Sequence, residues 1–83
     1  LGGHIHGWRM VLGLTAQQVA ERADITRDTL RKIESGNPNV SFNSVAQVLR
    51  ALGLLDRVVD AVDPLNSDIG RLRADRLTRR RAR

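Results

Sequence analysis

The chain has 83 residues, no cysteine and a formal net charge of +5 at pH 7. A chain of this length forms at most one small domain, and without cysteine it holds neither a disulfide framework nor a cysteine-ligated zinc site. No apolar run approaches the roughly 20 residues of a membrane-spanning helix, and the start lacks a signal-peptide pattern. We expect a cytoplasmic protein with no membrane contact, and Leu1 in place of Met leaves room for a preceding segment.

The positive charge is concentrated at the C-terminal end. Residues 1–70 hold seven Lys or Arg against eight Asp or Glu, whereas residues 71–83 hold seven Arg against Asp75 alone. This distribution predicts a near-neutral domain over residues 1–63, followed by a linker and basic tail over residues 64–83.

The first predicted helix covers residues 3–12. His4 and His6 lie two positions apart on it and point to different faces, so we expect an exposed helix start and no metal site. Trp8 is expected to pack at the edge of the core, because a lone tryptophan on a helix is more often a packing residue than a ligand-stacking one.

Two short helices follow, over residues 16–23 and 27–35, joined by a tight turn. Thr15 and Gln18 predict a capping box at the start of the first. Asp24 tolerates the left-handed backbone that the turn needs. Thr26 caps the second helix, and the residues expected in the core of the pair are Val19, Ala20, Ala23, Leu30 and Ile33.

Two further helices are predicted over residues 42–52, after a Ser41 cap, and 54–62, before the Asp63-Pro64 stop. The first contributes Val45, Val48, Leu49 and Leu52 to the core. The second carries more apolar surface than a small five-helix body needs to close, so part of it should bury against a second copy. The predicted dimer interface consists of Leu55, Val58, Val59 and Val62.

These motifs occur together in an order and spacing that resembles the Cro/C1-type (XRE) helix-turn-helix family, from Ile5 through Leu54. The matching residues are Ile5-x-x-x-Arg9-x-x-x-Gly13-Leu14-Thr15, Val19-Ala20, Thr26-x-x-Thr29-Leu30-x-x-Ile33-Glu34-x-Gly36 and Ser41-Phe42-x-x-Val45. The resemblance implies an all-α, compact five-helix, lambda-repressor-like DNA-binding domain with an Arg-rich C-terminal tail. It also implies an ion pair between Arg9 and Glu34 with a structural role.

By the family pattern, the second helix of the pair enters the major groove of double-stranded DNA. The expected base contacts are Arg27, Asp28, Arg31 and Lys32, and the expected phosphate contacts are Gln17, Thr26, Thr29 and Asn43. Arg and Lys favour guanine, Asp favours cytosine, and short polar side chains hold the backbone. Simple solvation of an exposed helix face is the alternative. Repression would come from a homodimer on a palindromic operator that blocks polymerase.

The tail carries apolar and basic residues that suit a partner protein: Ile69, Leu72, Arg73, Arg76, Leu77 and Arg80. The alternatives are a disordered solubilising end and, least favoured, a membrane-surface segment. A compact XRE domain with an Arg-rich end also resembles HipB-like antitoxins, which repress their own operon and bind HipA-like kinase toxins. A freestanding XRE repressor and a protein adaptor without DNA binding are the competing interpretations.

No catalytic constellation is present, and the chain is too small to surround a substrate, so we predict neither an enzyme nor a cofactor.

Overall fold

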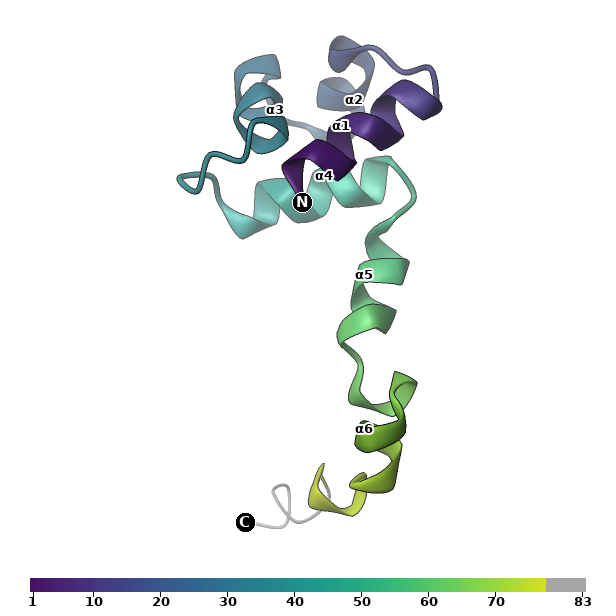
Figure 1. Ribbon diagram of the computed structural model, residues 1–83. Helices are drawn as coiled ribbons and strands as arrows, with labels where there is room; N and C mark the ends of the chain where they lie inside the picture. The colour runs from purple at the N-terminus through teal and green to yellow at the C-terminus, as the bar shows by residue number, and fades with distance from the viewer. Residues whose placement is uncertain (78–83) are drawn as a thin grey trace.

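The computed structural model describes residues 1–77, which fold into helices and connecting turns (Figure 1). The all-α class predicted from the sequence is confirmed. In chain order the helices are α1 (Gly2–Val11), α2 (Ala16–Ala23), α3 (Arg27–Glu34), α4 (Phe42–Ala51), α5 (Leu55–Val62), the 3-10 helix η1 (Pro64–Asn66) and α6 (Asp68–Leu72).

The starts of α2, α3 and α4 follow from local side-chain caps, as predicted. The Thr15 backbone N–H donates to Gln18 Oε1 at 2.9 Å, and Thr15 Oγ1 accepts from the Gln18 backbone N–H at 3.1 Å. Thr26 caps α3 and Ser41 caps α4 in the same way, each hydroxyl accepting from the backbone three residues on. Because these bonds satisfy amide groups that a helix leaves open, they fix where each helix begins.

The turn between α2 and α3 also has the predicted conformation. Asp24 is left-handed, with φ 55° and ψ 46°, and its backbone N–H bonds back to the end of α2. Ile25 is half-buried beneath the turn and packs against the core. The helix pair therefore reverses direction within three residues, which sets the orientation of α3 relative to α2.

Residues from four helices form the hydrophobic core, in which α2 packs mainly against α4 and α3. Val19 and Val48 have no exposed surface, and the predicted Val45 is half-buried at the margin. Ile5 brings α1 into the core. The buried side chains are Ile5, Val19, Ala20, Ala23, Leu30, Ile33, Val48, Leu49 and Leu52.

Helix α1 begins in close contact with the end of α3. A Cβ added to Gly2 would lie 2.4 Å from the backbone oxygen of Ile33, whereas a Cβ added to Gly3 would have no neighbour within 4 Å. Backbone atoms do not yield to such overlap without moving a whole helix. Gly2 is thus the residue that permits α1 to approach α3.

We expect Gly2→Ala to lower the free energy of unfolding by about 1–3 kcal/mol through this overlap. Gly3→Ala is the matched control, because it adds the same methyl in open space and gains about 0.5–1 kcal/mol of helix propensity. Urea titrations followed by far-UV circular dichroism measure both. Equal stabilities of the two variants would contradict the close approach.

An arm extends from the body (Figure 1), where α5 leaves α4 and η1 and α6 continue away from α1–α3. The chain measures 46 × 25 × 19 Å as a result. Among the α5 residues, Leu55 and Val58 pack on the core, while Val59 and Val62 are 55% and 77% exposed.

The segment predicted as a linker contains two short helices, η1 and α6. The Asp63 carboxylate accepts from the Leu65 backbone N–H at 2.9 Å and starts η1. The Ser67 hydroxyl accepts from the Gly70 backbone N–H at 3.0 Å and starts α6. Polar pairs such as Asn66-Ser67 commonly mark loops, but here Ser67 is a helix cap. Of the predicted tail residues, Arg80 lies outside the described residues.

Candidate nucleic-acid interface

Helix α3 presents one buried and one solvent-facing side. Leu30 and Ile33 are 1% and 4% exposed and fix the helix on the core. The opposite side carries the four predicted base-contacting residues, of which Arg27, Asp28 and Arg31 are exposed and Lys32 is half-exposed. The sequence therefore predicts correctly which side of α3 faces solvent, and we call this the free side. Burial of Leu30 and Ile33 keeps it turned away from the core.

Three of these side chains form a charged cluster. Arg31 donates to Asp28 Oδ1 at 2.6 Å, and Lys32 Nζ lies 3.3 Å from Asp28 Oδ2. The hydrogen bond from Arg31, followed by that from Lys32, holds the pKa of Asp28 below its usual value. Asp28 is thus ionised and positions two cations on the free side, while Arg27 makes no ion pair with a described residue.

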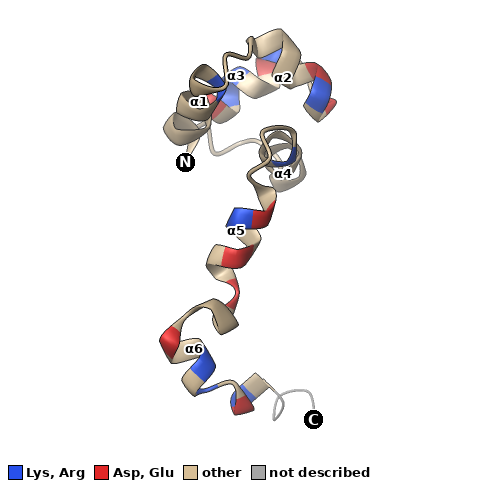
Figure 2. Ribbon diagram, turned by 90° about the vertical axis from the view of Figure 1, so that its right-hand side faces the viewer, with Lys and Arg blue, Asp and Glu red and all other residues tan. Residues whose placement is uncertain are grey.

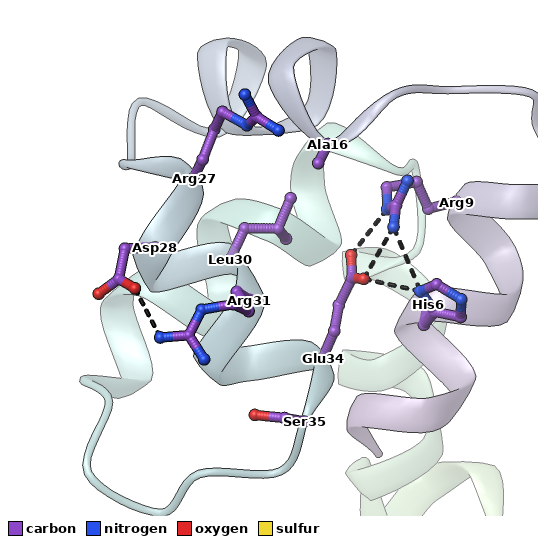
Figure 3. Close-up of a pocket in the computed structure, with 9 residues that line it drawn as sticks. All are labelled: His6, Arg9, Ala16, Arg27, Asp28, Leu30, Arg31, Glu34 and Ser35. Carbon is purple, nitrogen blue, oxygen red and sulfur yellow. Dashed lines mark hydrogen bonds and ion pairs between the residues drawn. The ribbon is translucent and has the colours of Figure 1, made fainter.

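An open hollow of about 670 Å³ lies beside this side of α3, between α3, α1 and the start of α2. Figure 3 shows Arg27 reaching toward Ala16 across the hollow, with Arg31 turned toward Asp28. Ala16, the first residue of α2, lines the same hollow. The hollow therefore joins the start of α2 to the free side of α3 in one concave surface.

The other wall of the hollow is a cluster that links α1 to the end of α3. Arg9 donates from Nε to Glu34 Oε2 at 2.8 Å and from Nη2 to Glu34 Oε1 at 3.0 Å. His6 Nδ1 lies 2.7 Å from Glu34 Oε1 (Figure 3). The side chains of Arg9 and Glu34 are only 13% and 12% exposed. The ion pair implied by the family resemblance is present, and it sets α1 against α3.

His6 is the member of this cluster that the sequence does not identify. The expected exposed helix start agrees with a side chain that is 51% exposed, yet the ring contacts Glu34 across the fold. The signal that could have found it is its spacing of three residues from Arg9, which places both on one side of α1.

The cluster controls the ionisation of Glu34. Burial alone would raise the pKa of Glu34, but hydrogen bonds from Arg9 and His6, together with their charges, bring it below its usual value of 4.5. The hydrogen bond to Glu34 likewise raises the pKa of Arg9. Both groups remain charged at neutral pH, so the contact is an ion pair.

The lowered pKa of Glu34 predicts acid sensitivity. Its folded-state pKa lies below the unfolded value, so the contribution to stability is full above about pH 4.5 and is lost as the pH falls through the folded-state pKa. We expect the free energy of unfolding to fall more steeply below this pH for the parent than for Glu34→Gln, in urea titrations between pH 7 and pH 3. Parallel pH profiles would contradict this assignment.

The predicted phosphate-contacting residues lie near three helix starts. Gln17 is in the first turn of α2 and donates to Glu21 at 2.8 Å, and Asn43 is exposed in the first turn of α4. Thr26 and Thr29 are joined at the start of α3 by a 2.9 Å hydrogen bond. Helix starts present free N–H groups and a partial positive charge, which suit phosphate. The contacts themselves stay predictions.

Neither a cluster of metal ligands nor a membrane-spanning helix is found among the described residues. Within residues 1–77 no group of three His, Asp or Glu side chains is placed to hold a metal ion. No described helix is long and apolar enough to cross a membrane.

The remaining predicted residues lie on the arm, far along the chain from the free side of α3. Of the predicted dimer interface, Leu55 and Val58 are half-buried against the core of the same chain, whereas Val59 and Val62 are exposed to solvent. The described tail residues are all exposed: Ile69, Leu72, Arg73, Arg76 and Leu77.

Comparison with known proteins agrees with this geometry. A family model described as a helix-turn-helix domain matches residues 1–62, which comprise α1 to α5. No curated protein and no solved structure gave a significant match. The α2–turn–α3 unit, with its left-handed Asp24 and its free cationic side on α3, lies inside the matched range. The chain belongs to the helix-turn-helix family of DNA-binding domains.

Proposed function

We propose that this chain is a transcriptional repressor that binds a palindromic operator as a homodimer and recognises its sequence with α3. The observation that carries the proposal is the position of Arg27, Arg31 and Lys32 on the free side of a helix whose other side is locked into the core. A rigid, cationic helix of this kind suits the major groove, which admits one α-helix.

The charged residues of α3 differ in whether they must leave an ion pair before they can contact DNA. Arg27 stands at the first position of α3 and has no partner to leave among the described residues, so it is free to donate two hydrogen bonds to guanine. Arg31 and Lys32 would have to exchange Asp28 for DNA, or Asp28 would accept from a cytosine amino group. Two copies would place their α3 helices about 34–36 Å apart, one turn of the duplex.

The arm favours a second candidate for the wider role. Ile69 and Leu72 are exposed next to basic residues, and such a surface suits a protein partner. An antitoxin that represses its own operon and binds a HipA-like kinase toxin would use α3 to bind DNA and the arm to bind the toxin. A freestanding repressor would need only DNA and a second copy, and an adaptor would need no DNA.

Selection of duplexes from a random library tests the DNA-binding proposal. We expect recovery of one palindromic sequence, with an affinity that falls steeply as salt rises because phosphate contacts release counterions. An affinity that is absent or independent of salt would favour the adaptor.

Purification from the native host, with the full chain and with a chain cut after Asp68, tests the antitoxin role. A kinase that is recovered with the full chain and lost on truncation would support it. Operator DNA recovered with the full chain, with no kinase in either sample, would favour the freestanding repressor.

A further inference from the structure

The α5 side of the arm combines apolar and acidic surface. Val59 and Val62, 55% and 77% exposed, form an apolar stripe. Beside this stripe run Asp56, Asp60 and Asp63, spaced by four and three residues so that they share one side of the helix. None of the three carboxylates makes an ion pair with a described residue. Asp63 accepts a backbone N–H and caps η1, whereas the carboxylates of Asp56 and Asp60 have neither a hydrogen bond nor an ion pair from a described side chain. The exposed apolar stripe and these two carboxylates thus lack a partner among the described residues.

The outer end of the arm has the opposite charge. Ile69 and Leu72 lie one helical turn apart and are 62% and 81% exposed. Arg73 and Arg76 follow them, exposed and without an ion pair to a described residue. Figure 2 shows mainly acidic residues along α5, with Arg57 among them, and mainly basic residues along and beyond α6, where Asp68 and Asp75 also lie. The carboxylates of Asp56 and Asp60 on α5 and the guanidinium groups of Arg73 and Arg76 at the outer end are therefore complementary in charge, and both parts expose apolar side chains.

The two complementary parts cannot close on each other within one chain. A Cβ on Gly70 would lie 1.6 Å from the backbone oxygen of Pro64, so α6 sits directly on η1. Arg71 donates to the Leu65 carbonyl at 3.0 Å, and Asn66 donates to the Asp60 carbonyl at 2.9 Å. These contacts hold α6 on η1 and leave Ile69 and Leu72 exposed to solvent rather than packed on α5 of the same chain.

We propose that α5 receives residues 68–77 of a second copy, and that the second copy receives the same segment in return. With the arms antiparallel, Val62 would face Ile69 of the second copy and Val59 would face its Leu72. The two-fold axis then passes beside Leu65, which is 48% exposed. Because the interface is self-complementary, each apolar and each charged contact is made twice.

This interface deepens the homodimer of the proposed function and rests on it. It differs from a pairing of the two α5 helices alone, because the basic segment becomes part of the dimer contact. A second copy is favoured over an unrelated protein because both complementary surfaces belong to this one chain. Acidic α5 surfaces facing each other without the basic segment would repel.

Charge reversal in the full-length protein tests the proposal. One variant carries Asp56→Arg with Asp60→Arg, and the other carries Arg73→Asp with Arg76→Asp. Each alone should weaken the homodimer about tenfold or more in sedimentation equilibrium, because like charges then face each other at both ends. Mixed in equal amounts, the two should form a heterodimer near the parental affinity, since opposite charges face each other again.

The matched control is Arg22→Asp with Arg50→Asp, which makes the same change in net charge on the exposed ends of α2 and α4 and should leave the dimer unchanged. A parental dimer that survives Arg73→Asp with Arg76→Asp would overturn the proposal, as would a monomeric parent or a mixture that stays monomeric. Binding of each variant to a single half-site reports on α3 separately. Absence of that binding in the parent would reject the proposed function without deciding how the two arms pair.

Discussion

Glu34→Ala is expected to lower the free energy of unfolding by about 3 kcal/mol, which is a large part of the total for a domain of this size. The side chain removed is the common acceptor for Arg9 and His6. Without it, the Arg9 guanidinium stays largely buried, with the Leu14 carbonyl and a His6 ring nitrogen, each at 3.2 Å, as its remaining partners and no opposite charge beside it. The expected loss lies at the lower end for buried pairs, because both side chains keep some contact with water.

Urea titrations of Glu34→Ala and of Asp28→Ala separate a buried from an exposed ion pair on the same helix. Asp28 is solvent-exposed, so its removal should leave the free energy of unfolding unchanged within error. The double variant Arg9→Met with Glu34→Leu removes both charges and should be markedly more stable than Glu34→Ala alone. Equal losses for the double variant and for Glu34→Ala would show that the cost is not an uncompensated charge.

The elements predicted most accurately are those that short-range chemistry determines. The capping box of Thr15 and Gln18 and the left-handed Asp24 each depend on residues within three or four positions, so the sequence displays them directly. The free side of α3 is also predictable, because burial of Leu30 and Ile33 at helical spacing decides which side faces water.

The contacts that escape prediction join residues far apart in the chain. His6 meets Glu34 across 28 positions, and Gly2 meets Ile33 because of the angle at which α1 crosses α3. The Arg57 guanidinium lies 5.6 Å from the centre of the Trp8 ring, a partner that spacing alone could not assign to this partly exposed side chain. Crossing angles depend on all the core side chains together, so no local pattern encodes them.

The arm shows a different limit of sequence reasoning. Its polar composition suggests a linker, but Asp63 and Ser67 each cap a short helix, and Gly70 allows α6 to sit on η1. Each of these helices is too short to be detected by periodicity. Most apolar residues of the arm beyond Val58 are exposed, as a partner-binding role requires. The proposal that a second copy is that partner rests in addition on the charges of α5 and of the outer end.

Arg27→Ala is expected to reduce the affinity for the full operator by about 2–6 kcal/mol, because each half-site loses one base contact worth about 1–3 kcal/mol. The folded domain should keep its stability, since Arg27 has no ion-pair partner among the described residues and stands at the positive end of α3. Fluorescence anisotropy with the selected operator and with scrambled duplexes measures the loss and shows whether it is confined to the operator.

The pattern of the loss identifies the role of Arg27. Removing a side chain that reads a base lowers the affinity for the operator, leaves the scrambled duplexes nearly unaffected and keeps the salt dependence. Removing one that binds a phosphate weakens all duplexes equally and reduces the salt slope by about one per site. Arg50→Ala removes the same charge from the last turn of α4, where no DNA contact is predicted, and should change neither. An Arg27→Ala variant that binds the operator as tightly as the parent would show that Arg27 makes no base contact.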